Sequence, residues 1–376
     1  MRAGSRGLLL AACAAAMAGC GGGAATHARR GPVVVAKPAL PAAHPEAVRD
    51  FESAVRALRA GGPEAQKRAE ADLRRAVGRD PRLWEAWHDL GAVLFARGDD
   101  EGAAAAFDRA LAINPAHAPA LMARAEAYRR AGDIARARAD YQELLRRKPD
   151  SADARARLAS LLRQAGDQDQ ALDVLREALR RTGGSSPIYL ELGLVYLAQG
   201  RHELAELVLS KAAALDPKGP AIYNALALVS MERHRYQEAF ERFDRATALD
   251  PGFLDARYNV ASVLIDAGDY ARAKSELEAV VARRPDDLGA VVALGIAYRG
   301  LGDHKKARAL WEGVVKDAPK RSTVRGDALF NLATLEMDFV MDEKSSARAL
   351  DRFLQESPEN HPRRKEAEER RKELGQ

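Results

Sequence analysis

The sequence has few of the residues on which disulfide-rich domains and aromatic binding sites depend. Its 376 residues include two cysteines, Cys13 and Cys20, and three tryptophans, and aromatic residues make up 6% of the chain. Because no cysteine follows residue 20, the rest of the chain contains no disulfide. The tryptophans Trp84, Trp87 and Trp311 fall on positions typical of helix packing and not of base stacking.

Motifs of catalysis are also missing. The eight histidines are scattered, and His202-Glu203 begins an HExxH motif that ends in Glu206 instead of a second histidine. The sequence has no Walker loop and no G-x-S-x-G elbow, and Gly183-Gly184-Ser185-Ser186 joins two repeated units, where a turn is expected. We therefore predict that the protein is not an enzyme and that it binds no cofactor and no metal.

The charge is nearly balanced. The formal net charge is +5 with 30% charged residues, and no stripe of basic and aromatic residues accompanies the excess. Nucleic acid is therefore excluded as an expected partner. One local surplus occurs at 118–163, which holds eleven Arg or Lys against six Asp or Glu. Such a surplus is typical of a solvated helix face, and it also suits a binding surface.

The sequence does contain a strict repeat. Four residues after each of eight alanines lies a large apolar residue, and eight residues further lies proline in seven units, with Gly183 in the remaining one. Five residues before the alanine, glycine occurs six times, and His234 is an exception. The alanines are spaced by 34 residues without insertion: Ala69, Ala103, Ala137, Ala171, Ala205, Ala239, Ala273 and Ala307.

Each repeated position has a mechanical explanation. Glycine adopts the left-handed conformation that ends a helix, and proline lacks the N–H that a helix interior requires. Alanine permits close approach of two helices, where a larger residue would overpack the contact. The sequence therefore predicts an all-α fold in which helix-turn-helix units stack on their neighbours.

Residues 84–117 resemble the tetratricopeptide repeat. The diagnostic positions are filled by Trp87, Leu90, Gly91, Leu94, Ala103, Phe107, Ala110 and Pro115. Further units begin at 118, 152, 186, 220, 254 and 288, a weaker unit at 50 lacks a convincing first helix, and a degenerate unit follows Pro319. The resemblance implies a right-handed α-solenoid that binds proteins. Arg124 and Ser230 replace expected apolar residues, which predicts softer packing there.

The N-terminus is typical of a bacterial lipoprotein signal. Arg2 and Arg6 precede the apolar run Leu8 to Gly19, which is too short to span a bilayer but suits a signal-peptide core. The run into Cys20 resembles a lipobox, and Cys13 offers a less favourable one; a simple secretory leader is the alternative. The resemblance implies acylation of Cys20, and Gly21 after it favours the outer membrane. We expect attachment to the membrane through this lipid only.

These features divide the chain into four parts. They are a signal peptide at 1–19, a flexible Gly-, Ala- and Pro-rich linker at 20–46, a repeat array at 47–321, and a degenerate repeat with a charged capping helix at 322–376. The array is expected to hold seven clear units and a degenerate first helix. Removal of the signal lowers the formal net charge to +3.

A partner is expected to bind along one stripe of the first helices. Positions 2, 5, 9 and 12 of each unit lie on a face separate from the core positions, and in tetratricopeptide arrays this face lines a groove. Leu190, Leu194 and Leu197 either line it or pack on neighbouring helices. The predicted groove residues, with neighbours, are Glu126, Arg129, Arg130, Arg157, Ser160, Arg163, Leu190, Leu194, Leu197, Asn224, Leu228, Met231, Tyr258, Asn259, Ile265, Arg299, Phe330 and Asn331.

The stripe is basic at first, then apolar, then aromatic and amide-bearing. It predicts a protein partner that supplies an extended or helical segment with an apolar stretch and acidic residues at one end. The repeats and lipobox together resemble outer-membrane lipoproteins of type IV pilus assembly or gliding motility. The expected function is a periplasm-facing scaffold for such an envelope machine. The alternative is a periplasmic chaperone or an adaptor for cell-wall enzymes.

Overall fold

The fold of the chain is helical wherever it is described. The computed structural model describes residues 43–340 and 342–374, and these residues form no strand. In chain order the helices are α1 (Pro45–Ala60), α2 (Pro63–Arg79), α3 (Trp84–Arg97), α4 (Asp100–Ile113), α5 (Ala118–Arg130), α6 (Ile134–Arg147), α7 (Ala152–Gln164), α8 (Gln168–Thr182), α9 (Ser186–Ala198), α10 (His202–Leu215), α11 (Pro220–Glu232), α12 (Tyr236–Leu249), α13 (Leu254–Asp266), α14 (Tyr270–Arg283), α15 (Leu288–Gly300), α16 (His304–Asp317), α17 (Thr323–Leu335), the π-helix η1 (Glu336–Val340), α18 (Glu343–Glu356) and α19 (Arg364–Glu373).

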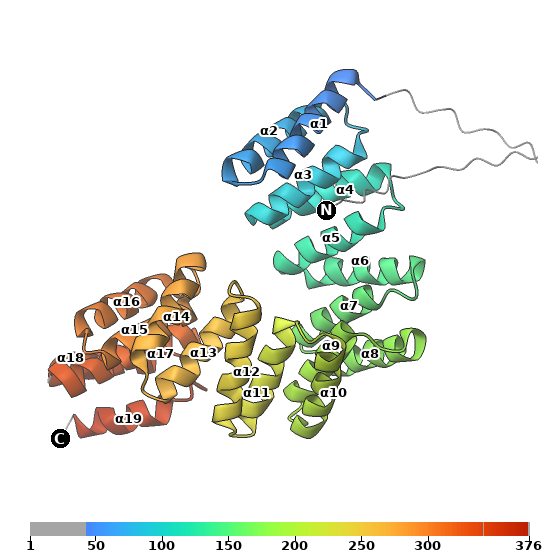
Figure 1. The fold of residues 1–376 in the computed structure, drawn as a ribbon. Coiled ribbons are helices and arrows are strands. Elements are labelled where there is room, and N and C mark those ends of the chain that lie inside the picture. The colour runs from blue at the N-terminus through green and yellow to red at the C-terminus, as the bar shows by residue number, and fades with distance from the viewer. Residues whose placement is uncertain (1–42, 341, 375–376) are drawn as a thin grey trace, which may run out of the picture. The chain divides into compact units, whose positions relative to one another are not determined.

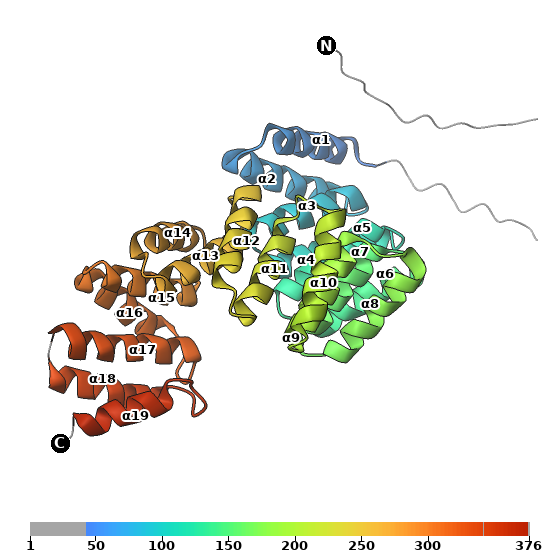
Figure 2. The same cartoon turned by 60° about the horizontal axis from the view of Figure 1, so that its bottom comes forward.

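Successive helices form hairpins that stack in chain order. α1 packs with α2, α3 with α4, and so on to α17 with α18, and the second helix of each hairpin also packs on the first helix of the next (Figure 1). At the C-terminal end α17, α18 and α19 follow one another as layers (Figure 2). The expected all-helical solenoid of stacked units is therefore confirmed.

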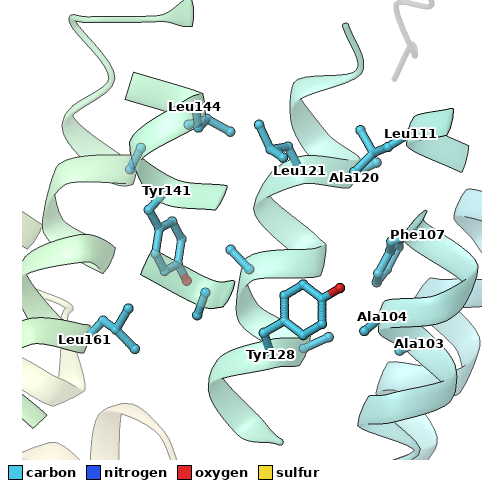
Figure 3. Close-up of a cluster of buried hydrophobic side chains, with 14 of the residues drawn as sticks. Ala103, Ala104, Phe107, Leu111, Ala120, Leu121, Tyr128, Tyr141, Leu144 and Leu161 are labelled. Carbon is cyan, nitrogen blue, oxygen red and sulfur yellow. The ribbon is translucent and has the colours of Figure 1, made fainter. Parts of the chain in front are cut away.

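The periodic residues form the contacts between helices. All eight alanines of the 34-residue step have no exposed surface, and the large residues four positions later are at most 1% exposed. Figure 3 shows Phe107 of α4 directed toward α5, and Tyr141 of α6 lying between α6 and α5. The alanine lets the helices approach, and the large side chain fills the remaining space between them.

The turns within the hairpins follow the predicted chemistry. Six glycines at the ends of first helices have φ between 69° and 89°, for example Gly98 and Gly132, and His234 adopts a φ of 58° at the corresponding position. Asp133 and Asp303 then cap the second helices by accepting hydrogen bonds from the backbone N–H of Arg136 at 2.9 Å and Lys306 at 3.1 Å. A helix N-terminus is stabilised by such a side-chain cap.

The first hairpin is more complete than the sequence suggested. Its first helix, α1, is regular over 16 residues and begins at Pro45, within the last residues of the expected linker. Its fully buried residues are Ala47, Ala54 and Ala57, and Phe51 and Leu58 pack against the core as partly buried residues. The helix begins five residues before position 50, where the 34-residue step places this unit, so it departs from the register of the repeat.

The two irregular core positions carry polar clusters. Arg124 donates from Nε and Nη2 to the Asp140 carboxylate at 2.8 and 2.6 Å and also pairs with Asp108. Burial would lower the pKa of Arg124, but its hydrogen bonds and the charges of both carboxylates raise it. Ser230 is fully buried and accepts a hydrogen bond from Arg242 Nη1 at 2.6 Å. The softer packing expected here is replaced by hydrogen-bonded contacts.

Candidate functional site

The predicted apolar stripe lies on α9 and α11. Leu190, Leu194 and Leu197 on α9, and Leu228 and Met231 on α11, are all half-buried. These side chains pack against the core clusters and keep part of their surface exposed. The three leucines therefore pack on neighbouring helices, as one interpretation holds, and their part in binding a partner stays a prediction.

A hollow of about 380 Å³ opens beside this stripe, across α5, α7 and α9. It brings together the predicted residues Arg129, Arg157 and Leu190, together with Glu126 and Ser160. Sequence analysis missed the other residues that line it, which are Tyr141, Asp153, Ala156, Gln164, Pro187 and Glu191. Tyr141 lies four residues after Ala137, at a core position of the repeat, yet it also lines this hollow.

Glu126 holds the polar groups at the centre of the hollow. Its carboxylate accepts hydrogen bonds from Arg129 Nε and from the Tyr141 hydroxyl, both at 3.0 Å, and Arg157 Nη1 lies 3.7 Å away. Burial would raise the pKa of Glu126, but Arg129, Tyr141 and Arg157 together lower it. At neutral pH the hollow therefore contains an ionised carboxylate that already occupies two arginines.

The remaining arginines of this section are paired as well. Arg163 Nε donates to Glu191 at 3.2 Å, and Arg157 Nε also donates to Asp153 at 3.3 Å. Burial raises the pKa of Glu191, and Arg163 only partly opposes this rise. On α5, Arg130 pairs with Asp100 at 3.1 Å. The four predicted arginines of this section are thus each paired with a carboxylate, although residues 118–163 keep a surplus of five positive charges.

An amide pair continues the stripe onto α13. Asn259 Nδ2 donates to Asn224 Oδ1 at 2.9 Å, which joins α13 to α11. Tyr258 beside it is half-buried, and burial, followed by the charges of Asp287 and Asp327, raises its pKa. Ile265, the last predicted residue of α13, is half-buried and packs on the core. Tyr258, Asn259 and Ile265 of the predicted section therefore lie on α13 beside Asn224 of α11, and their part in binding stays a prediction.

The prediction for Phe330 and Asn331 is wrong. Each is 2% exposed, so neither is available to a partner. The Phe330 ring packs edge-on against Phe353 at 5.7 Å between centroids, and the guanidinium of Arg363 lies 4.9 Å from its centroid. Asn331 donates from Nδ2 to a backbone carbonyl one turn earlier in α17. The segment that follows α18 covers this part of the stripe.

Arg299 marks the last accessible position. It is half-buried on α15, and its guanidinium carbon lies 5.8 Å from the centroid of Trp311. Burial lowers the pKa of Arg299, and the positive charges of Arg363 and Arg370 lower it further. The predicted residues that keep accessible surface therefore lie on helices from α5 to α15, and those on α17 are buried.

Some sequence predictions concern parts or properties beyond this stripe. Cys20 and the linker up to residue 42 lie outside the described residues. In the described part of the chain, no group of three or more His, Cys, Asp or Glu side chains is placed to hold a metal ion. None of the described helices combines the length and the hydropathy needed to cross a bilayer.

Comparisons with known proteins identify the repeats of this chain. Tetratricopeptide repeat models match residues 84–117, 122–186, 162–229, 230–294 and 264–326. No curated protein matches the chain. A thermophilic TPR protein from Thermus thermophilus is 30% identical, with 49% of this chain and 100% of that chain covered and a TM-score of 0.44.

Two further solved structures are more distant in sequence. The pilF protein of Pseudomonas aeruginosa is 20% identical, with 54% of this chain and 92% of that chain covered and a TM-score of 0.46. A human IFIT1 dimer with PPP-AAAA is 15% identical, with 87% of this chain and 80% of that chain covered and a TM-score of 0.60. At such identities the likeness concerns the fold alone.

Proposed function

The chain belongs to the tetratricopeptide-repeat family, and we propose that it is a non-enzymatic scaffold whose stripe from α5 to α13 binds a protein segment. Proteins with these repeats generally act as interaction scaffolds and are typically not catalytic. The observation that carries the proposal is the row of half-buried apolar side chains on α9 and α11 beside the hollow at α7. Partly exposed apolar rows next to polar groups are typical of peptide-binding grooves.

The proposed ligand is an extended or helical segment with an apolar stretch. Its apolar residues would rest on Leu190, Leu194 and Met231, which retain exposed surface. Acidic residues at one end would face Arg129 and Arg157, where they must replace Glu126 as the partner of the guanidinium groups. This exchange costs an existing ion pair, so we expect the apolar contacts to supply most of the affinity.

The double variant Leu194→Asp/Met231→Asp tests the stripe. Two carboxylates on this surface should abolish capture of the partner in a crosslinking pull-down of the tagged protein from native membranes, as read by quantitative mass spectrometry. Leu207→Asp is the matched control, because Leu207 is 67% exposed on α10 and lies outside the stripe. Circular dichroism should stay helical for all variants, and unchanged capture by the double variant would refute the proposal.

We also propose that Cys20 carries the lipid and holds the protein in the bacterial outer membrane, facing the periplasm. The support is the basic, apolar and small-residue order that leads into Cys20, with Gly21 following it. Several acyl chains anchor a protein stably, whereas one chain does so only marginally. Cys20→Ala should release the protein from the membrane fraction and remove the lipid mass, while Cys13→Ala should change neither. Retention of Cys20→Ala in the membrane would contradict the anchor.

For the cellular role, we propose assembly of an envelope machine such as a type IV pilus, a gliding-motility apparatus or a secretion system. The support is the joint presence of a lipobox and a long repeat array in one chain. The same pull-down discriminates among roles, because it identifies the proteins captured through the stripe. Components of such a machine that depend on Leu194 and Met231 are expected, whereas capture of cell-wall enzymes would favour an adaptor.

A further inference from the structure

A hollow of about 800 Å³ lies between the second helices α4 and α6. Ala104 and Tyr128 line it, together with the carboxylates of Glu101 and Asp108 and the guanidinium of Arg136. Figure 3 shows Tyr128 of α5 with its hydroxyl directed toward α4, where Ala104 lies. None of the stripe residues that the structure describes lines this hollow, so it is a surface distinct from the proposed partner groove.

The repeat explains why the hollow exists. The residue that follows each alanine of the 34-residue step is large in seven units, and only Ala104 is small. In two other units this residue reaches the next unit. Arg138 Nη2 donates to Gln170 at 2.7 Å, and Glu206 pairs with Arg233 Nη1 at 2.9 Å. The seven large residues are Glu70, Arg138, Leu172, Glu206, Phe240, Lys274 and Arg308. At Ala104 the bridging side chain is missing, and the space between α4 and α6 is open.

A later pair of units shows which side chain fits this place. Lys274 lies on α14 at the position of Ala104, five steps of the repeat later. Its Nζ is 5.5 Å from the centroid of the Tyr298 ring and 3.9 Å from Glu278 Oε1. The Tyr298 hydroxyl donates to the same oxygen at 2.7 Å, and Lys306 Nζ lies 5.0 Å from the ring centroid. The Lys274 ammonium is therefore beside both a tyrosine ring and the carboxylate that accepts the hydrogen bond of that tyrosine.

The hollow at Ala104 has the corresponding groups without the lysine. The Tyr128 hydroxyl donates to Asp108 at 3.3 Å, and the guanidinium carbon of Arg136 lies 4.4 Å from the centroid of the Tyr128 ring. Arg136 also pairs with Asp133, as Lys306 pairs with Asp303. Tyr128, Asp108, Arg136 and Asp133 stand five steps before Tyr298, Glu278, Lys306 and Asp303. The tyrosine, its carboxylate and the second cation are thus in place, and the first cation is missing.

The balance of charge favours an added cation in the hollow. Around Tyr298, two carboxylates face two ammonium groups. The ionisable residues that line the hollow, with the groups paired to them, include four carboxylates and two guanidinium groups, which leaves an excess of two negative charges. They are Glu101, Asp108, Asp133 and Asp140, and Arg124 and Arg136. Arg124 is shared between Asp108 and Asp140, so it does not remove this excess.

We propose that this hollow binds the side chain of a lysine that a partner protein presents. The ammonium would lie beside the Tyr128 ring and Asp108, as the ammonium of Lys274 lies beside its own tyrosine and carboxylate. The four-carbon stem would rest on Ala104 and Ala135, which both line the hollow. Contacts of a cation with a ring and a carboxylate are individually weak, so the site adds selectivity for a lysine-bearing segment and does not hold a partner alone.

Titration of the full-length chain with Nα-acetyl-lysine methylamide tests the site. The matched probe is Nα-acetyl-norleucine methylamide, which has the same four-carbon stem without the ammonium. Ionic strength is held constant with sodium chloride, and the ring resonances of Tyr128 are followed by NMR after assignment with Y128F. They are expected to shift and saturate with the lysine probe only. Absence of saturation with the lysine probe, or equal saturation with both probes, would overturn the proposal.

Variants exchange the two equivalent places. A104K supplies the missing side chain from the chain itself and should abolish saturation at Tyr128. K274A removes the lysine from the later place and should produce a saturating shift at Tyr298 that the wild type does not show. Retained saturation at Tyr128 in A104K, or no response at Tyr298 in K274A, would contradict the equivalence on which the proposal rests.

A carboxylate variant separates this site from general charge screening. D108N should weaken binding of the lysine probe about three- to fivefold. D173N is the control, because Asp173 is an exposed carboxylate on α8 that pairs with Arg176, and it should leave the affinity unchanged. Circular dichroism checks the helical content of each variant. Equal affinities in D108N and D173N would refute the role of Asp108, whatever the outcome for the stripe.

Discussion

Two sections of the predicted stripe differ in how far other residues cover them and in which groups lie beside their side chains. On α5 to α9 the apolar residues stay half-exposed, and Glu126, Asp153 and Glu191 neutralise the arginines. On α17 the aromatic residue of the predicted stripe lies buried under arginines of the α19 segment. The repeat thus fixes the helix framework, whereas accessibility of the stripe depends on the segment that follows each helix.

The largest expected effect is on stability, when Phe330 in the buried section and Leu194 in the accessible section are each replaced by alanine. Leu194 and Phe330 both belong to the predicted stripe, but Leu194 is half-buried and Phe330 is fully buried. Phe330→Ala should lower the free energy of unfolding by about 3–5 kcal/mol, because it leaves a cavity in the core. Leu194→Ala should lower it by about 1 kcal/mol. Urea unfolding followed by circular dichroism measures both, and equal changes would contradict the difference in burial.

A glycine substitution tests how closely the segment after α18 packs on α17. A Cβ on Gly326 of α17 would lie 2.8 Å from the His361 ring and 2.9 Å from Ser357 Cβ, so Gly326→Ala should destabilise the protein by about 1–3 kcal/mol. Gly313→Ala is the control, because nothing lies within 4 Å of its added Cβ and helix propensity should add up to about 1 kcal/mol of stability. Hydrogen exchange should be faster in the α19 segment of Gly326→Ala only; protection equal to that of the wild type would disprove the close contact.

The smallest expected effect is the pH dependence of stability that comes from Glu126 and Glu191, which lie in the section from α5 to α9. The pKa of Glu126 is lowered on folding, so its stabilisation is present above the ordinary value and disappears as pH falls through the folded pKa. The pKa of Glu191 is raised, so stability decreases as pH rises from its ordinary value through the folded pKa.

Unfolding midpoints of Glu126→Gln and Glu191→Gln, measured from acidic to neutral pH, separate these effects. Glu126→Gln should lose less stability on acidification than the wild type does, since the substituted side chain cannot titrate. Glu191→Gln should lose less stability between its ordinary pKa and neutral pH. Carboxyl-carbon NMR should show Glu126 titrating at lower pH than Glu191, and the reverse order would refute the assignment of burial and pairing.

The spacing of the alanines was sufficient to predict the hairpins and their core. It also located the leucines and the amide pair, because their positions repeat with the helix period. The charge balance was not predictable in this way, since Glu191 lies 28 residues after Arg163 and Asp100 lies 30 residues before Arg130. Those pairs form between neighbouring units, and only the stacking of the helices brings them into contact.

Two further features could not be predicted from the repeat. The burial of Phe330 depends on α19, whose sequence is mostly charged and contributes only Ala367 to the fully buried core. Nothing in the unit that contains Phe330 reveals that arginines of a later helix cover its ring. The first helix was missed because it begins five residues before position 50, where the 34-residue step places its unit.

The stacking of each hairpin on its neighbour gives the chain a mechanical property. The buried apolar residues fall into four successive clusters along the chain, and adjoining hairpins link them. Tension applied between the two ends is therefore carried by hairpins connected in series. Under load we expect such a chain to lengthen stepwise, with one hairpin detaching while its neighbours hold.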